Sequence, residues 1–164
     1  MAKFAKIGLN NVVERLVYMS NLDTMNDDGV LDETIGKEKL EAETGHATWL
    51  LCTELNGDPS RKNIPTVGWT YSSSYNGFYS PRPIDRSGVA CTSWTLNSST
   101  CKWDAPITKP LDFWTVDYVS AGIASTACNS AGPGGGHQDT WHWNEVAYDA
   151  DTDSPKTIGW VLQN

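Results

Sequence analysis

The chain has 164 residues, a length that suits one domain of ordinary size. Its formal net charge is −8, from 20 acidic and 12 basic residues, so nucleic acid and anionic membranes would on average repel it. No apolar stretch approaches the roughly 18 residues of a membrane-spanning helix, and the first residues lack the apolar run of a signal peptide. We therefore expect no membrane span, and synthesis in a cytoplasm.

Tryptophan is the unusual component, with eight copies against three Phe and three Met. A Trp ring buries a large surface and keeps one N–H donor, so it suits partly buried positions and interfaces. We expect most of these rings in the core or on half-exposed sheet faces.

Residues 1–20 are expected to form two N-terminal strands. Apolar and β-branched residues recur in 4–9 and 12–18, and Asn10 and Asn11 between them tolerate the positive φ of a tight turn. A helix over 12–19 is the competing interpretation, because its apolar residues also fit helical spacing.

Residues 21–46 are expected to form an acidic segment with a turn and a short helix. The stretch 26–29 has the composition of a turn. The stretch 37–43 contains good helix formers and is followed by a plausible stop at Gly45.

Residues 47–164 are expected to consist of β-hairpins, because short aromatic runs alternate with Gly, Pro, Ser, Thr and Asn. The stretch 48–53 is predicted to be a strand, and 57–60 a turn or loop. The glycine-rich stretch 132–136 lacks the Lys-Ser or Lys-Thr of a phosphate-binding loop. The surrounding residues 122–137 are expected to be mobile or to order only against a partner.

An internal repeat organises this region, with copies at about 66–81, 93–106 and 141–161. Trp69 in the first copy corresponds to Trp94 in the second, an offset of 94 − 69 = 25 residues. The third copy is split by a polar insertion, 145–156, which is expected to be a lengthened turn.

The repeat predicts cross-strand aromatic pairs. A four-residue turn at 97–100 would place Trp94 opposite Trp103, and the same register places Trp69 opposite Phe78. Trp141 and Trp160 are the corresponding structural aromatics of the third copy. The same register does not place Cys91 opposite Cys101. A lone hairpin is marginal in water, so the copies must pack together or onto a neighbour.

Several strings of residues resemble a family of small phage proteins. They are Arg61-Lys62-Asn63, Gly68-Trp69-Thr70-Tyr71, Pro81-Arg82-Pro83, Ser93-Trp94-Thr95-Leu96-Asn97 and Thr100-Cys101-Lys102-Trp103. The family occurs in marine phages, especially those that infect cyanobacteria. The resemblance covers the first strands and residues 61–106 well and the end of the chain loosely. It implies a component of the virus particle and no particular chemistry. The insertions 86–91 and 117–138 depart from the family pattern.

The sequence offers no recognisable catalytic or metal-binding pattern. His46 stands alone, and His137 and His142 are five residues apart, which would place them on opposite faces of a strand. An EF-hand is excluded, because with the glycine of the 26–29 turn at the invariant position, Thr24 and Ile35 would occupy the two anchoring ligand positions. No Gly-x-Ser-x-Gly elbow is present.

The four cysteines are Cys52, Cys91, Cys101 and Cys128. They form no C-x-x-C pair, so a structural zinc site is not expected. Cytoplasmic folding favours free thiols. Cys128 and His137 are only a loose candidate for a nucleophile and its base.

We therefore predict a mainly β fold of antiparallel hairpin repeats in a small sandwich or meander, with at most one short helix, in a single domain, 1–164. The predicted function is that of a virion structural protein, not an enzyme, without cofactors. The leading role is capsid decoration or cementing, with the major capsid protein or other virion proteins as partners. Alternatives are a tail, neck or fibre accessory protein, and a glycan-binding module that uses exposed Trp rings.

The candidate interface residues are charged and lie outside the aromatic runs. They are Arg61, Lys62, Arg82, Arg86, Asp151 and Asp153. Self-association of the chain into a homo-oligomer is left open, and neither nucleic acid nor a membrane is an expected partner.

Overall fold

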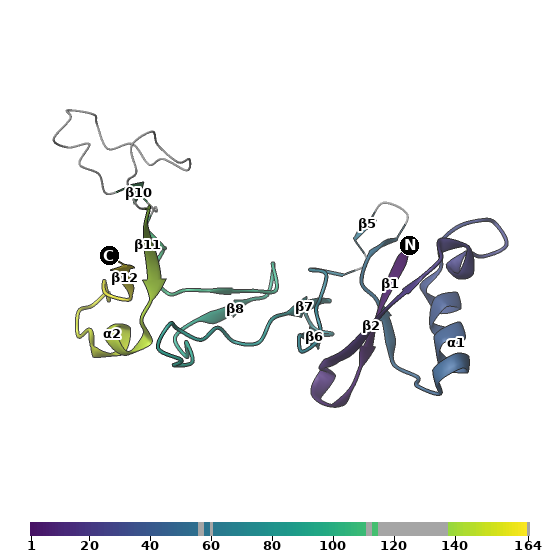
Figure 1. The fold of residues 1–164 in the computed structure, drawn as a ribbon, viewed down its shortest axis with the longest axis horizontal. Helices are drawn as coiled ribbons and strands as arrows, with labels where there is room; N and C mark the ends of the chain where they lie inside the picture. Colours follow the sequence, from purple (N-terminus) through teal and green to yellow (C-terminus); the bar gives the residue numbers. More distant parts are fainter. Residues whose placement is uncertain (56–57, 60, 111–112, 115–137, 164) are drawn as a thin grey trace. The chain divides into compact units, whose positions relative to one another are not determined.

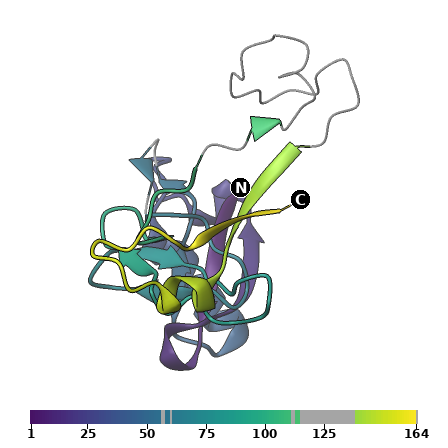
Figure 2. The same ribbon diagram turned by 90° about the vertical axis from the view of Figure 1, so that its left-hand side faces the viewer.

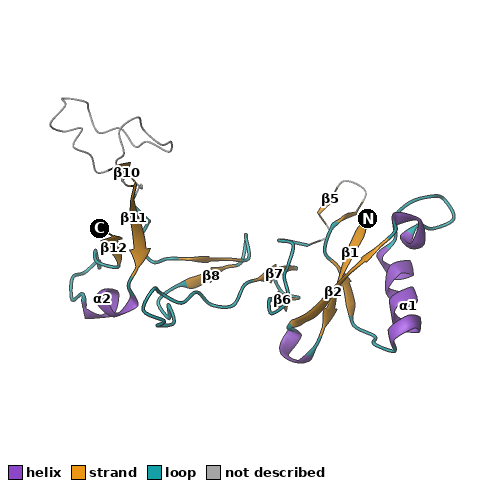
Figure 3. Cartoon of the chain, viewed as in Figure 1, coloured by secondary structure: helices purple, strands orange, loops and turns teal. Residues whose placement is uncertain are grey.

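The computed structural model describes residues 1–55, 58–59, 61–110, 113–114 and 138–163 (Figure 1). The described part is mainly β, in small antiparallel sheets, which confirms the predicted fold class (Figure 3). The sequence predicts a single domain, 1–164. The chain divides into two compact units, residues 1–81 with 96–103 and residues 82–95 with 104–164.

The first unit contains a three-stranded sheet in the order β2-β1-β3. Its strands are β1 (Ala2–Ile7), β2 (Val13–Met19) and β3 (Trp49–Leu51). β1 and β2 pair antiparallel, and Asn10 and Asn11 between them have φ values of 56° and 60°. The predicted N-terminal hairpin is therefore confirmed, and the competing helix is excluded.

The acidic segment folds into a 3₁₀ turn, η2 (Asn21–Thr24), a tight turn and the helix α1 (Glu33–Thr44). The tight turn closes through a bond from the Gly29 N–H to the Asn26 carbonyl, as predicted. Asp32 caps the helix by accepting from the Thr34 N–H, and Gly45 ends it with a φ of 67°. The predicted stop is confirmed, while the helix begins earlier than predicted because of the Asp32 cap.

The core of the first unit lies on both faces of β1, because successive side chains of a strand point to opposite faces. Ala2 and Phe4 belong to one apolar cluster, which also contains Leu40, Trp49 and Leu51. Ala5 and Ile7 belong to the other cluster, which also contains Val13, Cys52 and Phe78. β1 is thus the central element of this unit.

The repeat predicted from the sequence is present as two hairpins. The first consists of β6 (Thr70–Ser72) and β7 (Gly77–Tyr79), and the second of β8 (Thr95–Asn97) and β9 (Lys102–Asp104). Each strand of the second hairpin lies 25 positions after its counterpart. Asn76 and Cys101, which correspond in the repeat, both have positive φ, 46° and 53°.

The predicted register of the aromatic pairs is wrong by two residues. Phe78 lies opposite Tyr71 rather than Trp69, and β8 begins after Trp94, so Trp94 is not paired with Trp103 across the hairpin. The error comes from the position of the turn. The predicted turn at 97–100 corresponds to 72–75 in the first hairpin, where the turn instead occupies 73–76. The turn ends at Asn76 because this residue adopts the left-handed conformation.

The third copy shows the same shift. β11 (Gln138–Trp143) pairs with β12 (Trp160–Gln163), the yellow strand at the C-terminus in Figure 2. Trp160 lies opposite Trp143, and Trp141 lies opposite Leu162. The alignment of the third copy therefore holds, but Trp143 replaces Trp141 as the partner of Trp160.

The insertion 145–156 is not simply a lengthened turn, because it begins with the helix α2 (Glu145–Ala150). Asn144 caps this helix by accepting from the Ala147 N–H. The remaining described strands are β4 (Glu54–Leu55), β5 (Asp58–Pro59) and β10 (Phe113–Trp114). The predicted mobile segment 122–137, the 117–137 portion of the predicted insertion and Cys128 lie outside the described residues.

Replacing Gly36 by alanine is expected to destabilise the protein, although the same change at an exposed helix position usually stabilises by about 1 kcal/mol. A Cβ at Gly36 would collide with the ring of Phe4, which is fully buried, and would press on Thr24. Overpacking of this kind costs about 1–3 kcal/mol. Thermal unfolding followed by circular dichroism tests this, with Glu38→Ala on the exposed face of α1 as the control. A higher melting temperature for Gly36→Ala than for the wild type would contradict this packing.

Candidate protein-binding surface

Arg61, a predicted interface residue, instead closes the free edge of β3. Leu51 and Phe4 form a non-hydrogen-bonded pair of the antiparallel ladder, so the N–H and the carbonyl of Leu51 point away from β1. The Leu51 N–H donates to Glu33 Oε1 at 3.0 Å, and Arg61 Nη1 donates to the Leu51 carbonyl at 2.6 Å. Arg61 and Glu33 also form an ion pair at 3.1 Å. The pair covers an edge that would otherwise accept another strand.

Lys62 joins the same segment to both hairpins of the first unit. Its backbone N–H donates to the Asn76 carbonyl, and its carbonyl accepts from the Phe78 N–H. Its Nζ donates to the Ser98 carbonyl at 2.9 Å. The side chain is therefore used within the protein, although it remains partly exposed.

Asn63 completes the link. It adopts a φ of 59°, and its Nδ2 donates to the carbonyls of Phe78, Thr100 and Cys101 at 2.9–3.0 Å. The string Arg61-Lys62-Asn63 is thus a structural connection between the sheet and the two hairpins. No spacing in the sequence indicated this role, because the partners lie 10 to 38 positions away.

Arg82 has a comparable role in the second unit. Its Nη1 donates to the carbonyls of Cys91, Thr92 and Trp94 at 2.7–3.1 Å. This fixes the loop before β8. Arg82 nevertheless remains exposed, as do the candidate interface residues Arg86 and Asp153, whereas Asp151 is buried.

The Glu145 carboxylate accepts four hydrogen bonds from described residues of the second unit. Only 2 % of Glu145 is exposed. Its carboxylate accepts from Thr92 Oγ1, from the N–H and hydroxyl of Ser93, and from Trp143 Nε1, at 2.6–2.9 Å. Burial acts to raise its pKa, but the bonds from Trp143, Ser93 and Thr92 hold the pKa below its ordinary value.

Two further buried carboxylates order loops in the second unit. Asp85 accepts from the N–H groups of Val89, Ser87 and Glu145, and these bonds hold its pKa below the ordinary value. Asp151 accepts from the N–H groups that follow it, and its pKa is lowered for the same reason. All three carboxylates therefore accept at least three hydrogen bonds from donors of the second unit.

The tryptophan rings pack against one another rather than forming an open platform. Trp94, Trp143 and Trp160 contact each other with centroid distances of 5.3–6.1 Å. None of the seven Trp side chains whose burial the structure describes is exposed. A row of exposed rings, which would favour glycan binding, is therefore not seen among them.

The other residues that carry chemistry lie apart or are buried. His46 Nε2 is 3.0 Å from the Ile7 carbonyl, and His142 Nδ1 is buried without a hydrogen-bond partner among the described residues. Cys52, Cys91 and Cys101 are free and buried, and burial raises the pKa of the Cys52 thiol to about 11. The described ranges contain no group of three or more His, Cys, Asp or Glu arranged to hold a metal ion. His137 lies outside these ranges.

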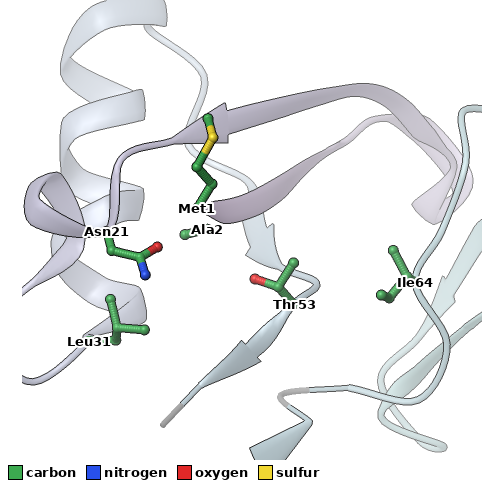
Figure 4. A pocket seen from close by; sticks show the side chains of 6 residues that line it. All are labelled: Met1, Ala2, Asn21, Leu31, Thr53 and Ile64. Atoms are coloured by element: carbon green, nitrogen blue, oxygen red, sulfur yellow. The ribbon is translucent and has the colours of Figure 1, made fainter. Parts of the chain in front are cut away.

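A shallow, mostly apolar hollow lies in the first unit. It has a volume of about 310 Å³. Figure 4 shows its lining, which comes from the start of β1, the acidic segment and the loops after β3: Met1, Ala2, Asn21, Leu31, Thr53 and Ile64. Met1 and Ile64 are 77 % and 59 % exposed, so apolar surface around the hollow faces solvent.

Comparisons with known proteins found no match, whether with family models, with curated proteins or with solved structures. Among the described residues, no helix is long and apolar enough to span a membrane.

Removing the side chain of Arg61 is expected to open the edge of β3. Arg61→Ala removes the guanidinium donor of the Leu51 carbonyl and of Glu33 Oε2, at a cost of about 1–3 kcal/mol in the free energy of unfolding. Arg61→Lys should recover only part of the loss, because an ammonium group cannot bond both acceptors in the same planar geometry. Chemical denaturation measures the stabilities, and light scattering measures association through the exposed edge. Equal stability of Arg61→Ala and the wild type would contradict this role.

Acid is expected to open the second unit before the first. The pKa values of Asp85, Glu145 and Asp151 in the folded protein lie below the ordinary values of these groups, which are near 4. The three carboxylates therefore stabilise the fold fully at a pH above the ordinary values. This stabilisation is lost as the pH falls through the lowered values and the carboxylates become protonated. Hydrogen exchange resolved by peptide, between pH 7 and pH 2, should show earlier loss of protection in 82–95 and 138–163 than in 1–55.

Glu145→Gln provides the matched test of this pH dependence. The amide keeps the size of the side chain but turns a donor group toward the donors of Ser93 and Trp143, which should cost about 1.5–3 kcal/mol and flatten the acid dependence. Glu41→Gln, on an exposed position of α1, serves as control. If protection of the second unit is lost over the same pH range in Glu145→Gln as in the wild type, the Glu145 carboxylate does not control the acid-induced opening.

Proposed function

We propose that this chain is a structural protein of a phage particle that binds other virion proteins, with capsid decoration or cementing as its leading role. The sequence resemblance to small proteins of marine phages supports the particle assignment. The same resemblance is compatible with a tail, neck or fibre accessory protein.

A binding role is supported by a contrast between two kinds of side chain, because carboxylates are buried and hydrogen-bonded while large apolar side chains are exposed. The buried carboxylates of the described chain are all bonded to donors of their own unit, which gives each of them a structural role. Large apolar side chains, by contrast, remain in solvent: Met1, Leu9, Leu22, Ile64, Val67, Ile84, Val146 and Ile158 are each at least 49 % exposed. Single apolar side chains are common on protein surfaces, and they favour contact with another protein where they lie together, as Met1 and Ile64 do at the hollow.

Particles of the encoding phage provide the test. The protein should co-purify with intact particles at a stoichiometry that matches a symmetric site, and cryo-electron microscopy should place it on the capsid. Density at the tail or neck would support the accessory role instead. If the protein is missing from purified particles and detected only in infected cells, the proposal is wrong.

A further inference from the structure

The first hairpin contains an Asn-Gly pair at the end of its turn, and the fold restricts both positions. Asn76 has an exposed side chain and a φ of 46°, a left-handed conformation that asparagine tolerates better than most residues. Gly77 is buried, and a Cβ there would lie 2.6 Å from Cys101 Sγ and 2.7 Å from Lys62 Cβ. The fold therefore places a side-chain amide directly before a residue that has no room for a side chain.

An Asn-Gly pair can undergo a reaction between its side chain and its main chain, because glycine has no Cβ to hinder the approach. The Gly77 nitrogen attacks Asn76 Cγ and loses its proton, a bond forms between these two atoms, and the bond from Cγ to Nδ2 breaks. Ammonia leaves, and the product is a five-membered succinimide. Water then opens the succinimide at either of its two carbonyls and yields aspartate or isoaspartate. The net change consumes one water molecule and releases one ammonia molecule, with no oxidation or reduction.

The folded hairpin engages the nitrogen that has to attack. The Phe78 N–H donates to the Lys62 carbonyl, so Tyr71 and Phe78 form a non-hydrogen-bonded pair of the ladder between β6 and β7. The next pair, Ser72 with Gly77, is therefore a hydrogen-bonded pair, in which the Gly77 N–H donates to the Ser72 carbonyl. The reaction consequently requires that the hairpin open locally.

Isoaspartate at this position would disturb the connection between the sheet and the hairpins. Its main chain runs through the side-chain carbon, so the backbone gains one methylene group. The Asn76 carbonyl, which accepts from the Lys62 N–H at 3.0 Å, would become part of a free carboxylate. The added length would also shift Gly77, whose surroundings have no room for one further carbon atom. Ordinary aspartate, by contrast, leaves the length of the backbone unchanged.

We infer that Asn76 is a site of non-enzymatic deamidation whose rate is set by opening of the first hairpin, and that the isoaspartate product weakens the link made by residues 61–63. The second hairpin lacks this chemistry, because Cys101 and Lys102 occupy the corresponding positions. The inference does not depend on the proposed function, since it concerns the chemical stability of the chain itself.

Peptide mapping by mass spectrometry tests the site on the full chain, incubated at mildly alkaline pH with and without denaturant. We expect isoaspartate at Asn76 in the unfolded chain and a rate at least about tenfold lower in the folded chain, because the Gly77 nitrogen is free only in the open hairpin. Mapping separates this pair from Asn56-Gly57, the other Asn-Gly pair of the sequence, which lies outside the described residues. Equal rates in the folded and unfolded chain, or no reaction at Asn76 in the unfolded chain, overturn the inference.

Asn63→Gly tests whether the link at 61–63 controls the opening. Glycine keeps the positive φ of 59° but removes the donor to three carbonyls of the two hairpins, so the folded chain should react about fivefold faster at Asn76. Asn10→Gly, the same change at an exposed left-handed asparagine of the first turn, is the control and should leave the rate unchanged. Equal rates of the two variants overturn the inference.

A denaturant series on the wild type gives a test that remains valid if Asn63→Gly fails to fold. Below the global unfolding transition, the deamidation rate at Asn76 and the hydrogen exchange of the Gly77 amide should rise in parallel, because both require the same opening. A deamidation rate that stays constant while the Gly77 amide exchanges faster overturns the inference.

Thermal unfolding tests the effect of the product. The isoaspartate form, separated by chromatography from aged wild type, should melt below freshly prepared Asn76→Asp, which carries the same charge on a backbone of ordinary length. Asn76→Gly tolerates the left-handed conformation and has no amide to lose, so ageing should lower its melting temperature less than that of the wild type. Equal melting of the isoaspartate form and Asn76→Asp overturns the inferred effect on the link at 61–63.

Discussion

Short strands leave many backbone N–H and C=O groups without a partner in a sheet, and burying such groups unbonded is costly. This constraint explains the most heavily bonded side chains of the protein. Arg61 and Glu33 bond the outer edge of β3, Asn63 bonds three carbonyls of the hairpins, and Arg82 bonds three carbonyls before β8. These side chains take the place of the long hydrogen-bonded ladders that two- and three-residue strands cannot provide.

The two units bury their interiors by different means. In the first, β1 is apolar on both faces and carries a cluster on each side. In the second, three tryptophan rings pack together, and three carboxylates are buried among backbone and side-chain donors. A carboxylate with several charge-assisted hydrogen bonds fixes loops that have few apolar residues to pack. Three of the eight Trp and three of the 20 acidic residues therefore have a structural role in the second unit.

Local signals predicted the parts of the fold that depend on neighbouring residues. The paired asparagines marked the first turn, Gly45 marked the end of α1, and the 25-residue offset identified equivalent hairpins. The register failed because Cys101 occupies the left-handed turn position, for which cysteine has no marked preference. α2 had a readable signal, since Asn144 precedes the helix formers Glu145 and Ala147.

The sites were harder to predict than the elements, because their members are distant in the chain. Glu145 meets Ser93 across 52 positions, and the hollow joins residue 1 to residue 64. A charged string such as Arg61-Lys62 has the same composition whether it binds a partner or the protein's own carbonyls. Tertiary contacts alone decide between the two, and here they assign Arg61 and Arg82 to the scaffold.

Because Arg61 and Arg82 bond groups of the protein itself, fewer kinds of exposed side chain remain to recognise a partner. Exposed apolar side chains supply affinity but little discrimination, because any apolar surface can cover them. Exposed aspartates add the discrimination, since they repel acidic surfaces and attract basic ones over about a Debye length. A net charge of −8 acts in the same direction at the level of the whole chain, because it opposes association between copies even where each copy exposes apolar side chains.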